Sequence, residues 1–245
     1  RPSTFFMLDL CKDVDGRNKS GHDDGEAPAS AGTTTVEALH LSDRPLRILV
    51  TGFGPFPGAP RNPTQALVAR LARLRRPVLA DVAVIDHIFP VSYGAVDLQL
   101  PDLLVRHQPH ALLMFGLASR TPHLRIETRA RNTLTTRWPD RDGRYNTHGA
   151  IVIGEDAMAF DPHTRRLLRA VQASGVEAKL SRDAGSYLCN YLCWRALEAA
   201  RAGSGARLAA FVHVPPVAPG PTTQAELARA GEALLLQMTA LARRK

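Results

Sequence analysis

Three residues, Cys189, His213 and Glu127, carry the side chains that nucleophilic catalysis by a thiol requires. A thiol attacks a carbonyl carbon once a neighbouring imidazole has taken its proton, and a carboxylate can orient that imidazole. Cys189 follows a predicted strand over 176–180 and a turn at 183–185, which places it in the first turn of the next helix. Unpaired N–H groups and the helix dipole favour a thiolate there, so we expect the pKa of this thiol to be lowered.

His213 and Glu127 lie where the sheet could bring them to the cysteine. His213 is near the end of a predicted strand over 208–214, just before two prolines that end the strand and hold the backbone. Glu127 belongs to an alternating segment over 124–131, within reach of the same edge. Binding sites in open α/β sheets form outside the carboxyl ends of the strands, so the three residues are candidates for one site.

Each of these residues also has an ordinary structural interpretation. A cysteine in an apolar helix is usually a small buried hydrophobe, which is the interpretation that we give to Cys193. A histidine inside an apolar strand is commonly a hydrogen-bonded structural residue. Glu127, in a segment with three arginines, would by default be a solvated ion-pair partner. Residue types and spacing alone therefore leave a Cys–His–Glu triad open.

Strands alternate with helices from residue 46 onward. Strands are predicted over 47–50, 82–89, 111–115, 124–131 (half-exposed), 176–180 and 208–214, and helices over 64–74, 95–106 (interrupted near Pro101), 165–172, 186–202 and 224–242, with loops dominating 133–161. This alternation predicts an α/β fold, a single domain with an open, twisted, mostly parallel sheet and helices on both faces.

Residues 1–45 differ from the rest of the chain. They contain a polar, glycine-rich stretch over 13–25 without apolar periodicity, which cannot bury enough surface to offset its ordering entropy. We interpret residues 1–45 as a disordered extension, or as sequence upstream of the true start. Residues 46–245 are then the catalytic domain.

The composition limits the class of protein further. The net charge of +8 comes from arginines scattered along the chain, and no basic run is interleaved with aromatics, so we expect no nucleic-acid partner. The 3 cysteines form neither a disulfide framework nor a zinc-ligand spacing, so we expect a reducing compartment and no cofactor or metal. No apolar run approaches the ~20 residues that span a bilayer. We therefore predict a cytoplasmic protein that does not act in a membrane.

Several motifs resemble those of the pyroglutamyl peptidase I family, also called pyrrolidone-carboxylate peptidase, in that family's order and at similar spacing. The motifs that carry the resemblance are TGFGPF at 51–56, Asn62-Pro63, Glu127 followed by Asn132, DAGSYLCN at 183–190 and FVHVP at 211–215. The similarity covers residues 47 to about 240.

This resemblance implies a cysteine-type omega peptidase that removes N-terminal pyroglutamate from peptides. Cys189 would be the nucleophile, His213 the base and Glu127 the residue that orients the base, with helix-start N–H groups stabilising the oxyanion. The lactam substrate has no free α-amine, so its pocket needs an apolar slot and a few hydrogen bonds. The pocket positions that the resemblance implies are Phe53, Phe56, Leu117, Tyr187 and Leu188. Bacterial members often form homotetramers, which suggests a homo-oligomer.

Departures from the family pattern leave two other functions open. Leu117 stands where many members carry a glutamine, and residues 119–126 lack the usual glycine–arginine pattern. A related cysteine amidohydrolase with altered specificity and a catalytically inactive homologue therefore remain alternatives. A nucleotide-binding loop at 52–58 is disfavoured, because its glycine spacing is not G-x-G-x-x-G and two prolines remove N–H groups that a phosphate would need.

Overall fold

The structure, a computed structural model, describes residues 45–56, 59–217 and 222–244. The strands in this part of the chain are β1 (Leu46–Phe53), β2 (Val82–Phe89), β3 (Ala111–Leu117), β4 (Leu124–Glu127), β5 (Arg129–Arg131), β6 (Ala157–Ala159), β7 (Ala178–Ser181) and β8 (Leu208–Val214). The helices are α2 (Pro63–Ala72), α3 (Tyr93–His107), α4 (Thr164–Ala173), α5 (Leu188–Arg201) and α6 (Gln224–Ala242), with a 3-10 helix η1 (Pro77–Leu79).

The central sheet has six strands in the order β2-β1-β3-β8-β4-β7, and β5 and β6 form a separate two-stranded ribbon. Strands β2, β1, β3 and β8 pair in parallel, whereas β4 runs antiparallel to β8 and parallel to β7. Strand β8 is buried along its whole length, as expected for a near-continuous apolar run inside a sheet that is covered on both sides.

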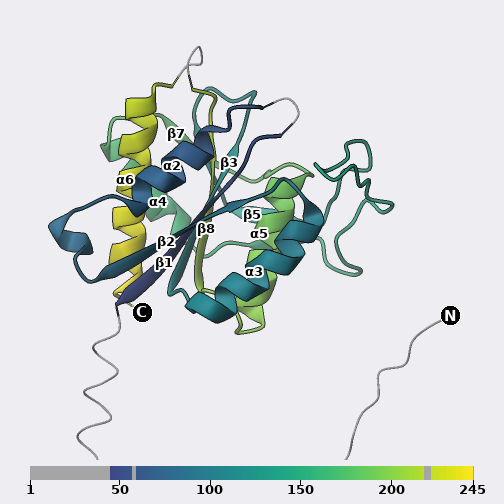
Figure 1. The fold of residues 1–245 in the computed structure, drawn as a ribbon, viewed down its shortest axis with the longest axis horizontal. Helices are drawn as coiled ribbons and strands as arrows, with labels where there is room; N and C mark the ends of the chain where they lie inside the picture. The colour runs from purple at the N-terminus through teal and green to yellow at the C-terminus, as the bar shows by residue number, and fades with distance from the viewer. Residues whose placement is uncertain (1–44, 57–58, 218–221, 245) are drawn as a thin grey trace, which may run out of the picture. The chain divides into compact units, whose positions relative to one another are not determined.

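Helices cover both faces of this sheet (Figure 1). The apolar residues of α2, α4 and α6 pack on one face, and those of α3 and α5 pack on the other. Phe211 belongs to the α3/α5 core, and His213, two residues further along β8, lies on the same face because strand side chains alternate. The predicted fold, a mostly parallel α/β sheet with helices on both faces, is confirmed.

Two local predictions are wrong. Helix α3 continues through Pro101, because this proline lies on the exposed face, where the carbonyl left without its N–H partner can bind water. Strand β3 continues past Gly116 to Leu117. The stretch 133–161 is dominated by loops, as predicted, and also contains the short strand β6.

The segment 124–131 is also not one half-exposed strand. It divides into β4 in the central sheet and β5 in the small ribbon. Leu124, Ile126 and Glu127 are fully buried, because β4 lies between β8 and β7 and is not at an edge. The prediction for residues 1–45 falls, apart from Pro45, outside the described residues and stays a prediction.

Candidate active site

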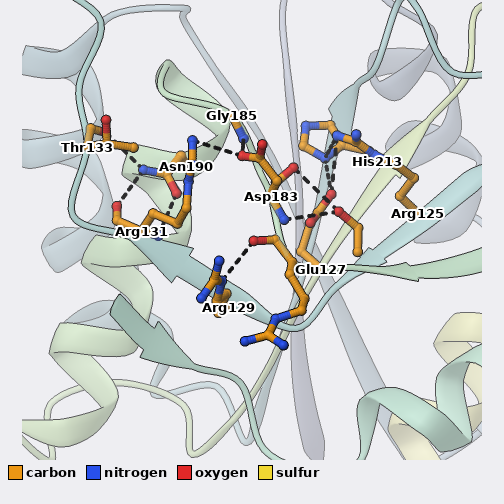
Figure 2. A network of polar contacts seen from close by, with 11 residues as sticks. Arg125, Glu127, Arg129, Arg131, Thr133, Asp183, Gly185, Asn190 and His213 are labelled. Carbon is orange, nitrogen blue, oxygen red and sulfur yellow. Dashed lines mark hydrogen bonds and ion pairs between the residues drawn. The ribbon is translucent and has the colours of Figure 1, made fainter. Parts of the chain in front are cut away.

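His213 and Glu127 form a buried pair on adjacent strands. Glu127 Oε1 lies 2.7 Å from His213 Nδ1, and the residues are 0% and 3% exposed, respectively (Figure 2). Strand β4 runs antiparallel to β8, with Ile126 opposite Val212. Glu127 therefore lies beside the middle of β8 and not beside the end of that strand. The carboxylate accepts the Nδ1–H bond, which leaves Nε2 as the basic nitrogen of the neutral ring. The interpretation of Glu127 as a solvated surface residue is wrong.

The protonation of His213 is set by opposing influences. Burial lowers the pKa of the imidazole, and the positive charge of Arg125 acts in the same direction, whereas the hydrogen bond and charge of Glu127 raise it. Burial is the largest influence, so the pKa of His213 lies below its usual value of 6.5. The ring is therefore neutral at neutral pH, which is the form that a general base needs.

Cys189 is the second residue of α5, in the first turn, as predicted. Its sulfur lies above Gly116, since a Cβ added to Gly116 would stand 2.7 Å from Cys189 Sγ. Gly116 is in turn the neighbour of His213 in the parallel pairing of β3 and β8. The thiol therefore lies over the strand next to the imidazole, although no hydrogen bond joins the two in the described part of the chain.

The expected low pKa of the Cys189 thiol is wrong. Cys189 as a residue is partly exposed, but burial of the thiol itself raises its pKa to about 12, and the nearby Glu127 carboxylate raises it further. Arg125 and the backbone N–H at the helix start lower the pKa, as the helix argument requires, but these effects are smaller. The resting pair is a neutral thiol beside a neutral imidazole.

The turn before α5 and the first turn of the helix are anchored to their surroundings. Gly185 has φ +87, a conformation that glycine adopts readily, and its N–H donates to Asp183 Oδ1 at 2.9 Å. The Asn190 side chain accepts from Arg131 N at 2.9 Å and donates to Arg131 O at 2.7 Å (Figure 2). No side chain caps the start of α5, so the N–H groups of its first turn remain available to a ligand.

One pocket of about 280 Å³ contains both Cys189 and His213. All five predicted pocket positions line it, while Glu127 lies behind the imidazole and does not. The residues that line the pocket are Phe53, Phe56, Asn62, Val91, Leu117, Ala118, Ser119, Arg120, Thr121, Arg125, Ala184, Gly185, Tyr187, Leu188, Cys189 and His213. The structure therefore brings together every residue that the sequence nominated.

The aromatic walls of this pocket are held by side-chain hydrogen bonds. Thr64 Oγ1 bonds both backbone groups of Phe53, donating to its carbonyl at 3.0 Å and accepting from its N–H at 3.1 Å. Asn62 donates to Gly54 O at 3.2 Å and caps α2 by accepting from Thr64 N at 3.1 Å. On the other side, the Tyr187 hydroxyl donates to Pro139 O at 2.7 Å. These bonds anchor the backbone that carries Phe53 and the side chain of Tyr187.

Three residues of the site were not identified from the sequence. They are Gly116, whose missing side chain makes room for the thiol, Asn190, which ties α5 to β5, and Arg125, which contacts the buried pair. Arg125 could have been predicted from strand alternation, because residues two apart on a strand lie on the same face and Arg125 is two residues before Glu127. No group of three or more metal-ligating side chains occurs within the described ranges.

Similarity to known proteins shows the family of this chain. The family model described as pyroglutamyl peptidase matches residues 46–238. The chain belongs to this family. It is 34% identical over 174 residues to the pyrrolidone-carboxylate peptidase of Halalkalibacterium halodurans, covering 69% of this chain and 83% of that protein. It is 31% identical over 173 residues to that of Thermococcus litoralis, covering 69% and 76%.

The fold is likewise similar to solved structures of this family. The crystal structure of pyrrolidone carboxyl peptidase from Fervidobacterium islandicum AW-1 matches with a TM-score of 0.72 and 26% identity, covering 78% of this chain and 96% of that one. The resemblance inferred from the motifs is confirmed, and the chain is a peptidase of the pyroglutamyl peptidase family. None of the described helices has the length and apolar character needed to cross a membrane.

Proposed function

We propose that this chain is a cysteine exopeptidase that removes N-terminal pyroglutamate from peptides, with Cys189 as nucleophile, His213 as base and Glu127 orienting the base. The observation that carries this proposal is the buried 2.7 Å contact between Glu127 and His213, behind a pocket that His213 and Cys189 both line. Family membership supports the same reaction class.

In the reaction, Cys189 Sγ attacks the carbonyl carbon that joins pyroglutamate to the next residue. His213 Nε2 takes the thiol proton and then gives it to the leaving amine as the C–N bond breaks, leaving a thioester that water hydrolyses. Because the thiol pKa is raised and the imidazole is neutral, the proton moves during the attack and not before it. Glu127 stabilises the imidazolium that forms in this step.

The pocket suits a neutral cyclic acyl group. Phe53 and Phe56 supply aromatic walls, and the uncapped start of α5 supplies N–H groups for the oxyanion. No aspartate or glutamate is among the described residues that line the pocket. A peptidase that binds a free α-ammonium group would need such a carboxylate, whereas the pyroglutamyl lactam carries no charge.

Kinetics on three matched amides test this specificity. We expect kcat/KM for a pyroglutamyl amide to exceed that for the prolyl and acetyl amides by at least about 100-fold, because prolyl brings an uncompensated ammonium group and acetyl lacks the ring. Equal turnover of the three amides would contradict the assignment. That result would support the alternative of a cysteine amidohydrolase with altered specificity, which the apolar Leu117 in the pocket favours. Turnover of none of them would indicate an inactive homologue.

We also propose the partners, the cellular location and the oligomeric state of the enzyme. Its partners are peptides with N-terminal pyroglutamate, and the cysteine usage supports a cytoplasmic location. Family resemblance supports a homo-oligomer, which light scattering of the purified chain would test.

A further inference from the structure

Arg125 joins the buried pair from the same face of the sheet. It lies directly opposite His213 in the antiparallel pairing of β4 and β8, and two residues before Glu127 on β4. Side chains at these positions point to one face and lie close together. Its Nη2 is 3.3 Å from Glu127 Oε1 and 3.2 Å from His213 Nδ1 (Figure 2).

The chemistry of these contacts shows which one is attractive. Nδ1 carries the proton that Glu127 Oε1 accepts at 2.7 Å, so it cannot also accept from Arg125. His213 therefore donates to Glu127 Oε1, and Arg125 forms an ion pair with the same oxygen. The attraction of Arg125 is to Glu127, and its charge opposes any positive charge on His213.

Glu127 needs such a partner because its side chain has no access to solvent. A buried carboxylate without a cation is strongly disfavoured, and the resting His213 is neutral. Within the described ranges, Glu127 forms ion-pair contacts with Arg125 and His213 alone. Arg125 is thus the partner that brings a positive charge to this carboxylate.

We propose that Arg125 is a positioning residue, the counter-ion that pairs with the buried Glu127 carboxylate and keeps it aimed at His213. This inference rests on the proposed roles of His213 and Glu127. The Arg125 side chain is 26% exposed and forms part of the wall of the pocket.

The other charges around His213 do not supply this role. Glu127 and Arg125 face the ring from β4, Asp183 acts on it from the turn after β7, and Cys189 approaches from α5. Glu127 and Asp183 both raise the pKa of His213, whereas Arg125 lowers it. Loss of Arg125 should therefore let the Glu127–His213 pair take up a proton at higher pH.

An NMR titration of the His213 ring measures this directly and needs no turnover. With labelled histidine, and with the His213 signal assigned by H213Q, we expect R125Q to move the titration midpoint to higher pH by about one pH unit. R125K, which keeps the charge, should restore the midpoint of the natural protein. R129Q is the matched control, since it removes an equal charge whose guanidinium donates to Arg182 O. A midpoint unmoved in R125Q, or moved equally in R125K, would overturn the proposal.

The pH profile gives a second readout. The acid limb of the pH profile of kcat/KM on a pyroglutamyl amide should move to higher pH in R125Q. The variant should then have a kcat/KM about tenfold below that of the natural protein on the acid limb, and a smaller deficit on the plateau at higher pH. A uniform loss at all pH values, with an unmoved limb, would mean that Arg125 only packs the pocket. Absence of any turnover in the natural protein would contradict the proposed function, while the NMR titration would still decide the role of Arg125.

A double variant covers the case in which R125Q does not fold. If the failure comes from a buried carboxylate without its counter-ion, R125Q/E127Q should fold, because it removes both charges. Circular dichroism and thermal unfolding of the two variants make the comparison. A double variant as unfolded as R125Q would contradict the counter-ion role.

Discussion

The sulfur of Cys189, the proposed nucleophile, fits where it does because residue 116 has no side chain. A Cβ at that position would stand 2.7 Å from Cys189 Sγ and 2.7 Å from Phe211 Cζ, closer than such atoms can approach. Gly116 therefore shapes the candidate site through the side chain that it lacks.

Substitution of Gly116 by alanine tests this placement. We expect G116A to lower kcat/KM by at least about 100-fold through displacement of the thiol, and to lower the free energy of unfolding by about 1–3 kcal/mol. G149A is a suitable control, because a Cβ at Gly149 meets no atom within 4 Å. Activity assays and thermal unfolding make the comparison, and full activity in G116A would show that the thiol is not where the structure has it.

The raised thiol pKa predicts how Cys189 reacts with iodoacetamide. Because burial raises this pKa to about 12, the thiolate fraction is small at pH 7 and grows as pH rises. Alkylation of Cys189, followed by mass spectrometry, should accelerate from pH 7 to above pH 9 without levelling off. The buried Cys193 should label more slowly. A rate that reaches a plateau below pH 8 would indicate a preformed thiolate.

At the scale of elements, the start of α2 holds the aromatic wall of the pocket. Asn62 caps the helix and also bonds Gly54 O, next to Phe53. We expect N62A to lower the free energy of unfolding by about 1 kcal/mol and to raise KM more than it lowers kcat, because the aromatic segment is released.

A second capping residue provides the control for this prediction. Thr223 caps α6 through a capping box and does not line the pocket. T223A should show a similar loss of stability with unchanged kinetic constants, measured by denaturant unfolding and by assays on a pyroglutamyl amide. Equal kinetic effects in N62A and T223A would mean that stability, and not the pocket wall, governs binding.

Elements with strong periodic patterns could be predicted from the sequence, and elements defined by their neighbours could not. The bounds of β2, β8 and α6 match the predictions to the residue, because apolar runs and helical spacing mark them. The break between β4 and β5 was missed, since alternation continues through Glu127 and Arg129 although the chain changes sheets. Which strand lies beside which is a tertiary property. The sequence of β4 therefore contains no signal that predicts its antiparallel pairing with β8.

The same distinction holds for the site. Local patterns, a helix start and a strand ended by prolines, made Cys189 and His213 candidates, and the family motifs then singled them out. The approach of Arg125 to Glu127 and the space above Gly116 depend on the pairing of β4 and β3 with β8, which no local pattern encodes. The sign of the thiol pKa shift was wrong for a related reason, because burial by distant residues outweighs the helix start.

For the molecule as a whole, the buried His213 makes stability depend on pH. Its pKa is lowered in the folded state, so the unfolded chain binds more protons as pH falls through about 6.5. This contribution to stability is complete above that pH and is lost below it. The free energy of unfolding should therefore fall between pH 7.5 and pH 5.5, and H213Q should reduce the slope of that fall. Denaturant unfolding across this range measures both, and an unchanged slope in H213Q would contradict the lowered pKa.

The proposed reaction requires Cys189 to act as the nucleophile in the pocket that it shares with His213. Release of a fluorophore from a pyroglutamyl amide tests this most directly, with C193A, a change at the buried cysteine four residues further along α5, as the matched control. We expect the natural protein and C193A to release the fluorophore, and C189A to lose at least about 1000-fold in kcat while it remains folded. Retained activity in C189A, or loss confined to C193A, would contradict the account.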